Sequence, residues 1–367
     1  MENEIRYFSM FTGVGGFELG LERANDRLCS KINQERFQSN KQEGNSSECS
    51  SEKRYPQGFR AVGFSEIDKY SNELLKNKWL NIKNWGDCTK INPHELPDFD
   101  MLCGGFPCQA FSIAGKRRGF SDTRGTLFFD IARIVKIKRP KIVFLENVKG
   151  LLNHEQGKTF RKIIQTLSEL GYNVQWMVLN SKFFGVPQNR ERVFIIGNLR
   201  GESRPEILPF NGNVGEINIK VAGYLNKDGW DKRNECIRRI YDSNGCSPTI
   251  PTGQGGGVMP KVLDDYNHRI KSDGIVGTVR QTFNNSKEGN GCKIIEDINI
   301  RRLTPLECER LQGFPDNWTA GFSDTQRYKM MGNAVTVNVI KAIGERLCSP
   351  TKTTTAREHI TKSEGKK

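Results

Sequence analysis

The strongest constraint on the fold lies at the start of the chain, where a strand pattern, a glycine-rich turn and a helical pattern follow one another directly. Residues 5–11 favour a buried strand, residues 12–16 read TGVGG, and Phe17 and Leu21 begin a helical repeat. This order is the first unit of a doubly wound α/β sheet, which binds its ligand at the turn. Glu18 departs from the dinucleotide pattern G-x-G-x-x-G, and a negative residue there suits a cofactor with an amino acid end better than a pyrophosphate. A tight turn without a ligand is the alternative.

Strands and helices continue to alternate as far as residue 196. Such alternation predicts a doubly wound, Rossmann-like α/β domain whose parallel strands end at one common edge. We predict strands over 60–65, 99–103, 141–145, 172–179 and 193–196, and helices over 68–76, 125–138 and 157–170.

The later part of the chain is organised differently. Residues 201–299 are irregular and rich in Gly, Asn and Asp, whereas order returns with a helix from Pro305 and a last amphipathic helix from Met331 to Leu347. We therefore expect a second, smaller domain that is mostly β or irregular. The predicted divisions are a catalytic domain over 1–187 with a disordered insertion at 26–58, the small domain over 188–322, a C-terminal helix over 323–348 that returns to the catalytic domain, and a flexible tail over 349–367.

Residues 104–109 read GGFPCQ and follow an apolar run. Pro107 fixes one backbone dihedral angle just before Cys108, so the cysteine stands on a stiff turn at the carboxyl end of a strand. That placement presents a thiol to a pocket as a nucleophile, and a buried structural cysteine is the alternative. Residues 114–139 follow with eight Lys or Arg and two Asp, which favours a substrate that carries phosphates.

The composition of the whole chain favours a polyanionic partner. The 367 residues carry 56 Lys and Arg against 42 Asp and Glu, a formal net charge of +14. The ten cysteines have no regular spacing and no C-x-x-C pair, no secretory signal precedes the first strand, and no apolar run reaches the length of a membrane span. We therefore expect reduced cysteines, no metal site and a cytoplasmic protein.

Acidic residues stand at the ends of several predicted segments. Glu66 is placed to bind ribose hydroxyls, and Asp68 to cap the helix that follows it. Asp87 is placed to accept a hydrogen bond from an adenine amino group, with an ordinary turn aspartate as the alternative. Glu146 ends the strand at 141–145, where burial would raise its proton affinity and make it an acid near neutral pH.

Residues 188–192 read QNRER, directly before the strand at 193–196. Gln188, Arg190 and Arg192 alternate, so an extended segment would show all three side chains on one face. Such a face could line a pocket, and a ladder of salt bridges on the surface is the alternative.

The ordered set of motifs from Phe8 to Leu347 resembles the DNA cytosine-5 methyltransferases of the bacterial restriction–modification type. Each motif alone is weak evidence for this family, and the evidence becomes specific because all of the motifs occur in the same order. The motifs are FTGVGG at 11–16, GGFPCQ at 104–109, GTLFFDIARI at 125–134, ENV at 146–148, QNRER at 188–192, RRLTPLECERLQGFP at 301–315 and MGNAV at 331–335.

The resemblance implies S-adenosyl-L-methionine as cofactor, double-stranded DNA as substrate, a monomer without a membrane or metal, and pairing with a cognate restriction endonuclease. The implied catalytic residues are Cys108, Glu146, Arg190 and Arg192. The implied cofactor contacts are Phe11, Gly13, Gly15, Gly16, Glu66, Ile67, Asp87, Cys88, Leu127, Asn333 and Val335. The expected DNA contacts are Gln109, Ser112, Lys116, Arg117, Arg118, Thr249 and Arg280, and either Thr249 or Thr278 takes the family's recognition-domain role.

The expected chemistry follows from the weakness of cytosine carbon 5 as a nucleophile. Addition of the Cys108 thiolate to carbon 6 would activate the ring, while Glu146 engages ring nitrogen 3. The base must leave the duplex stack to meet these groups, and the choice of target is expected from residues 201–299.

Two other functions compete with this expectation. The first is a tRNA cytosine-5 methyltransferase, a branch expected to carry Cys-Phe-Thr, although no cysteine here precedes Phe. The second is a DNA-binding module without catalytic activity, which the presence of Cys108, Glu146 and Arg192 opposes.

Overall fold

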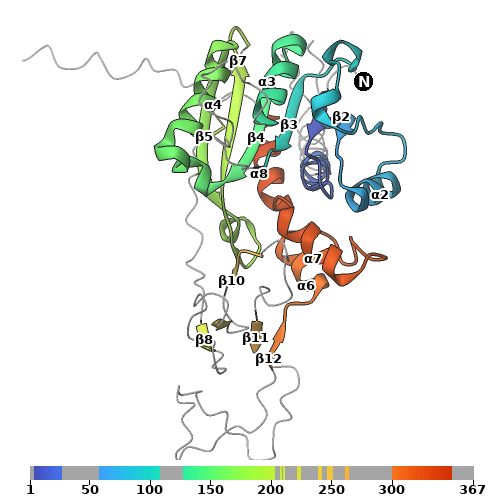
Figure 1. The fold of residues 1–367 in the computed structure, drawn as a ribbon, viewed down its shortest axis with the longest axis vertical. Helices are drawn as coiled ribbons and strands as arrows, with labels where there is room; N and C mark the ends of the chain where they lie inside the picture. Colours follow the sequence, from blue (N-terminus) through green and yellow to red (C-terminus); the bar gives the residue numbers. More distant parts are fainter. Residues whose placement is uncertain are drawn as a thin grey trace, which may run out of the picture.

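A six-stranded sheet forms the centre of the computed structural model (Figure 1). The structure describes residues 4–26, 58–107, 127–202, 207–208, 210, 221–224, 239–241, 246–250, 261–263 and 300–348. The strand order is β2-β1-β3-β4-β7-β5, with β7 antiparallel to both of its neighbours and β1 to β4 parallel. The bounds are β1 (Glu4–Met10), β2 (Gly58–Ser65), β3 (Met101–Gly105), β4 (Ile142–Val148), β5 (Tyr172–Asn180) and β7 (Glu191–Leu199).

The order of the first strands creates a switch point between β1 and β3. The chain leaves β1 for β2 on one side and then returns to place β3 on the other side of β1. In open α/β sheets, ligands bind outside the carboxyl ends of the strands at such a point. The turn after β1 and the turn after β3, which carry two of the predicted motifs, therefore meet at one edge.

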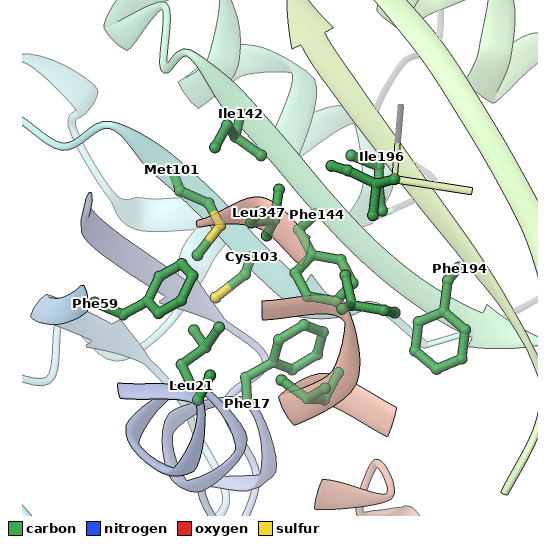
Figure 2. Packing of buried hydrophobic residues seen from close by; sticks show 14 of the residues in the cluster. Phe17, Leu21, Phe59, Met101, Cys103, Ile142, Phe144, Phe194, Ile196 and Leu347 are labelled. Atoms are coloured by element: carbon green, nitrogen blue, oxygen red, sulfur yellow. The ribbon is translucent and has the colours of Figure 1, made fainter. Parts of the chain in front are cut away.

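Helices cover both faces of the sheet, as expected for a doubly wound fold. The first helix, described over 16–26, and α8 (Val337–Leu347) cover one face, whereas α3 (Leu127–Lys138) and α4 (Lys158–Glu169) cover the other. Figure 2 shows Phe17 and Leu21 of the first helix and Leu347 of α8 gathered over Cys103 and Phe144 of the sheet. The predicted doubly wound α/β class is confirmed.

The caps explain where two further helices begin. Asp68 accepts hydrogen bonds from the backbone N–H groups of Tyr70 and Ser71, so its predicted role as the N-cap of α2 (Lys69–Lys78) is confirmed. Thr304 and Glu307 form a capping box at the start of α6 (Pro305–Leu311), whose start at Pro305 is also confirmed.

The predicted single helix over 323–348 is wrong, because the structure has two helices there. The first, α7 (Asp324–Asn333), ends before an extended Ala334 with φ −63° and ψ 145°, and α8 starts at Val337. An unbroken helix would use the carbonyls of this stretch internally. Instead, Ala334 O accepts from the Arg190 guanidinium, and the Val337 N–H donates to Gln312 O.

The predicted domain boundary at residue 188 also needs correction. Strand β7 pairs with β4 and β5 along its length, so residues 191–199 belong to the large sheet. The short strands form separate groups beyond it: β6 (Gln188–Asn189) with β10 (Ser247–Pro248), and a four-stranded sheet of β8 (Val221–Tyr224), β9 (Arg239–Tyr241), β11 (Lys261–Leu263) and β12 (Ile300–Arg302). Figure 1 shows α6 and α7 between the large sheet and β11 and β12.

Five short 3-10 helices complete the described part: η1 (Cys88–Lys90), η2 (Pro93–Glu95), η3 (Lys149–Leu152), η4 (His154–Gly157) and η5 (Ser181–Phe184). Among the helices of the described ranges, none is long and apolar enough to cross a membrane. Residues 27–57 of the predicted insertion and the predicted tail at 349–367 lie outside the described residues.

Candidate active site

Glu146 lies near the carboxyl end of β4, in the middle of the sheet. In the strand register it stands beside Gly105 of β3 and Phe194 of β7. A Cβ on residue 105 would lie 2.9 Å from Glu146 Oε2, so a glycine at this position gives the carboxylate its room. The second glycine of GGFPCQ is therefore explained by the acid on the neighbouring strand.

The Glu146 carboxyl is buried beside a guanidinium. The residue is 9% exposed, and its Oε1 lies 3.2 Å from Arg192 Nε. Burial raises the pKa of Glu146 above its ordinary value, and the charges of Arg192 and Arg190 offset only part of that rise. A buried carboxyl of this kind can keep a proton near neutral pH and donate it in a hydrogen bond. The predicted burial and increased proton affinity are confirmed.

Asn147 connects this acid to the turn that leads to the predicted nucleophile. Its side chain is buried, and Nδ2 donates to Phe106 O at 2.9 Å. Asn147 was not predicted as a site residue, although an amide directly after the acid, near the end of a buried strand, is a usable signal. Cys108 lies two residues beyond Phe106, outside the described residues.

Gln188 and Arg190 are buried, which confirms the predicted alternation and excludes the surface ladder. Their exposures are 0% and 2%. Gln188 Nε2 donates to Leu311 O at 3.0 Å, and Arg190 Nη2 donates to Gly332 O at 3.0 Å and to Ala334 O at 2.8 Å. Both side chains therefore donate hydrogen bonds to backbone carbonyls of the motifs at 301–315 and 331–335.

The turn after β1 is held in an unusual conformation. Phe11 has φ of 56°, a left-handed value that is uncommon outside glycine, and its N–H donates to Ser65 O at 2.8 Å. Gly15 has φ of 84°, and a Cβ there would overlap the ring of Trp79. Glycine at position 15 is thus required by the backbone and by the aromatic ring.

Glu66 ties the end of β2 to this turn. Its Oε2 accepts from the Gly13 N–H at 2.6 Å, and its Oε1 accepts from the N–H groups of Ile67 at 2.8 Å and Asp68 at 2.7 Å. Oε1 already accepts two hydrogen bonds and Oε2 only one, so the predicted contact with ribose remains open to Oε2. The Ile67 side chain beside it is 73% exposed and offers an apolar surface at the switch point.

Asp87 and Cys88 lie at the start of η1. Asp87 accepts from the Thr89 N–H at 3.0 Å and from Thr89 Oγ1 at 2.8 Å, which is the arrangement of the turn alternative. Its predicted adenine contact remains a prediction. Burial raises the pKa of Cys88 to about 12, so this thiol stays protonated and unreactive.

Asn84 was not predicted as a candidate site residue, although it holds a segment that carries a predicted cofactor contact. Its Oδ1 accepts from the N–H groups of Glu66 at 3.1 Å and Gly86 at 3.0 Å, and its Nδ2 donates to Glu66 O at 3.1 Å. The side chain therefore joins the backbone of Glu66 to that of Gly86, the residue directly before Asp87. An Asn two residues before a glycine is typical of an Asx turn, and that signal was available.

The remaining predicted cofactor contacts come from distant parts of the chain. Val335 lies against Gly16 of the first turn. Asn333 ends α7 and is exposed, although its neighbours Gly332 and Ala334 are buried. Leu127 starts the described part of α3 and is half-buried against the core on that face of the sheet.

The predicted DNA contacts are described at only one position. Thr249 Oγ1 donates to Asn189 O at 2.9 Å, which joins the threonine to the QNRER segment. Outside the described residues lie Gln109, Ser112, Lys116, Arg117, Arg118, Thr278 and Arg280.

Comparison with protein families and curated proteins gives consistent matches. A family model described as C-5 cytosine-specific DNA methylase matches residues 5–349. The type II methyltransferase M1.ScrFI of Lactococcus lactis subsp. cremoris is 39% identical over 78% of this chain and 72% of its own length. The type II methyltransferase M.HhaI of Haemophilus parahaemolyticus is 33% identical over 94% of each chain.

Solved structures agree on the fold. A crystal structure of a Spodoptera frugiperda DNMT2 mutant matches with a TM-score of 0.62 at 17% identity, covering 94% of this chain and 99% of that one. The S. pombe Dnmt2 methyltransferase matches with a TM-score of 0.61 at 17% identity, covering 94% of this chain and 98% of that one.

Proposed function

Because the chain belongs to the C-5 cytosine-specific DNA methylase family, we propose that it transfers a methyl group from S-adenosyl-L-methionine to carbon 5 of a cytosine flipped out of double-stranded DNA. The observation that carries the proposal is the buried pair of Glu146 and Arg192, 3.2 Å apart, beside the turn that leads to Cys108. A protonated acid beside a guanidinium suits the edge of a cytosine ring, which offers ring nitrogen 3 and the neighbouring carbonyl as acceptors.

The nucleophilic step belongs to Cys108. Its thiolate adds to carbon 6, and the electron pair of the carbon 5–carbon 6 double bond moves so that carbon 5 becomes nucleophilic. When bound, S-adenosyl-L-methionine supplies the electrophilic methyl group that carbon 5 takes. Loss of the carbon 5 proton to a base then expels the Cys108 thiolate and restores the aromatic ring.

Glu146 stabilises the charge that develops on the ring. Addition of a thiolate places negative charge on ring nitrogen 3, and a protonated carboxyl can donate to that atom. Burial raises the pKa of Glu146, which favours the protonated carboxyl that this hydrogen bond requires. Arg192 holds the carboxyl in place and can donate to the ring carbonyl.

The residues at the switch point fit the proposed cofactor. The turn after β1 has Phe11 in a left-handed conformation and lacks the glycine pattern of a pyrophosphate-binding turn. Glu66 would hold the ribose hydroxyls, exposed Ile67 would pack on the adenine, and Asp87 would accept from the adenine amino group. Asn333 and Val335 would close the site from the later part of the chain.

DNA recognition is proposed for the irregular part of the chain. Residues 201–299 follow the large sheet and choose the target, and Thr249 takes the family's recognition-domain role, a proposal supported by its hydrogen bond to Asn189. Replacement of 201–299 by the corresponding segment of a relative with another target, followed by mapping of methylated cytosines, tests this: an active hybrid that keeps the original site contradicts it. We further propose that the enzyme works as a monomer on cytoplasmic DNA, paired with a cognate restriction endonuclease.

The test of the proposed function is a methylation assay with labelled S-adenosyl-L-methionine. Label should enter duplex DNA and not tRNA, and bisulfite sequencing should find it on cytosines in one sequence context. DNA with 5-fluorocytosine at that site should trap the enzyme covalently, because fluorine cannot leave as a proton. Trapping should disappear in Cys108→Ser. Label found only in tRNA would favour the alternative tRNA methyltransferase, and label in neither substrate would contradict both.

A further inference from the structure

Arg190 joins two parts of the candidate site, the stretch around Asn333 and the segment that carries Arg192. Its Nη2 donates to the carbonyls of Gly332 and Ala334, at 3.0 and 2.8 Å. These two residues stand on either side of Asn333, an expected cofactor contact. Through its backbone, Arg190 also belongs to the extended segment that carries Arg192, the partner of Glu146.

Most of the donor capacity of Arg190 is unused. The residue is 2% exposed, and among the residues that the structure describes, no group accepts from its Nε or Nη1. Its electrostatic neighbours are Arg192 and Glu146, the two residues of the proposed base pocket. Buried guanidinium donors without acceptors are unfavourable, so a ligand that supplied acceptor oxygens or nitrogens there would stabilise this arrangement.

Hydrogen bonds from a second side hold the same linker. Gln312 Nε2 donates to Met331 O at 2.8 Å, Thr336 Oγ1 donates to Gln312 Oε1 at 2.8 Å, and the Val337 N–H donates to Gln312 O at 3.0 Å. The linker between α7 and α8 is therefore clamped between Gln312 and Arg190. A displacement of Asn333 must move the guanidinium, and a displacement of the guanidinium must move Asn333.

We propose that Arg190 is a positioning residue that couples cofactor binding to base binding, an inference that rests on the proposed function. A cofactor on Asn333 fixes the carbonyls of Gly332 and Ala334, and these fix Arg190 against the base pocket. A base that accepts from Arg190 fixes the same carbonyls from the other side. Each ligand thus orders groups that the other needs, and linkage requires the effect to be equal in both directions.

The test is a thermodynamic cycle with S-adenosyl-L-homocysteine as a cofactor probe that cannot transfer a methyl group. The Kd of a target duplex is measured with and without the probe, and the Kd of the probe with and without the duplex. In the wild type, each ligand should tighten the other by about 5–150-fold, the usual range of such coupling. Arg190→Lys should reduce this factor to less than about twofold, whereas the Kd of the probe alone should stay within about threefold, because the probe does not contact Arg190.

Arg192→Lys is the matched control. It changes the same chemical group two residues away and should slow methyl transfer by disturbing Glu146, yet it should keep the coupling factor, because Arg192 does not bind the linker. A merely structural role of Arg190 predicts the opposite pattern, in which both single-ligand affinities weaken and the factor is unchanged. That result would overturn the proposal.

A second measurement on the wild type covers the case in which Arg190→Lys does not fold. Amide hydrogen exchange is followed at residues 331–337 with the duplex alone, without any cofactor. Slower exchange there would show that the base pocket orders the linker, and unchanged exchange would refute the coupling. The proposed function fails separately, by absence of methyl transfer, since neither of these measurements requires turnover.

Discussion

At the scale of single residues, Gly105 shows that the site depends on the close approach of the β3 backbone to the Glu146 carboxylate. Replacement by alanine would place a Cβ 2.9 Å from Glu146 Oε2, so the carboxylate must shift away from its present position. We expect Gly105→Ala to lower kcat about tenfold or more, since small displacements of catalytic groups are costly, with little loss of stability. Gly150→Ala, where a Cβ meets nothing within 4 Å, is the control. Equal kcat values for the two variants would contradict the prediction.

Glu18 should make folding stability depend on pH. It is fully buried under the turn after β1, and burial, followed in smaller part by the charges of Glu22 and Glu66, raises its pKa from 4.5 to about 7. The folded protein therefore holds this proton more tightly than the unfolded chain. The associated stability is fully present below pH 4.5 and is lost as pH rises through about 7, by about 3 kcal/mol in total.

Glu18→Gln should remove that dependence. Urea unfolding of both proteins between pH 5 and 8 gives the difference in free energy of unfolding, in which the titrations of other groups cancel. We expect the variant to gain stability relative to the wild type as pH rises. A difference that does not change with pH would show that Glu18 stays charged in the folded protein.

At the scale of elements, the turn after β1 is braced by aromatic rings from α2 and from the segment after α6. Trp79, which follows α2, covers Gly15 and meets Trp318 at a centroid distance of 5.9 Å. Trp318 Nε1 donates to Val14 O at 3.0 Å. The conformation of the turn is thus fixed from outside, by elements far away in the sequence.

Gly15→Ala should weaken both folding and cofactor binding. The φ of 84° alone destabilises an alanine by roughly 1–2 kcal/mol, and overlap with Trp79 adds roughly 1–3 kcal/mol. Gly201→Ala separates the two effects, because it has φ of 93° and nothing within 4 Å of its Cβ. Urea unfolding and titration with S-adenosyl-L-homocysteine measure both. Equal losses of stability and of cofactor affinity in the two variants would mean that the Trp79 side chain moves aside at no cost in free energy.

Sequence patterns predicted the elements that rest on local signals and missed those that rest on distant contacts. The strand at 172–179, the cap at Asp68 and the alternation of Gln188 with Arg190 follow from periodicity and side-chain chemistry, and the structure confirms them. The break between α7 and α8 depends on carbonyls that Arg190 binds from 142 and 144 positions away, which no local pattern contains.

The position of β7 was missed for a similar reason. Its apolar residues predicted a strand at 193–196, but membership of the large sheet is decided by pairing with β4 and β5. In the site, acidic and glycine positions were predictable because their chemistry is local. Asn84 and Asn147 each carry a local signal, but the segments that they hold together are distant partners, which no local pattern identifies.

At the scale of the whole molecule, the formal charge of +14 should make DNA binding dependent on salt. Changing Lys116, Arg117 and Arg118 to glutamine should weaken binding to all sequences alike, and should flatten the slope of log Kd against log salt by about 0.9 per lost phosphate contact. The control changes three exposed residues of the α3 and α4 layer, Lys136, Lys158 and Arg161, which removes the same charge. Equal slopes for the two triple variants would show that net charge acts without local contacts.

The first helix and α8 share one core cluster, and Gly16 touches Val335 across almost the whole length of the chain. During synthesis, a ribosome that adds about 5–20 residues per second completes the turn after β1 many seconds before it reaches α8. Until then, one face of the sheet lacks its second helix and the turn lacks its closing side chain. The nascent protein therefore exposes apolar surface on that face during this interval, and it acquires its binding site late, when the last helix leaves the ribosome and docks.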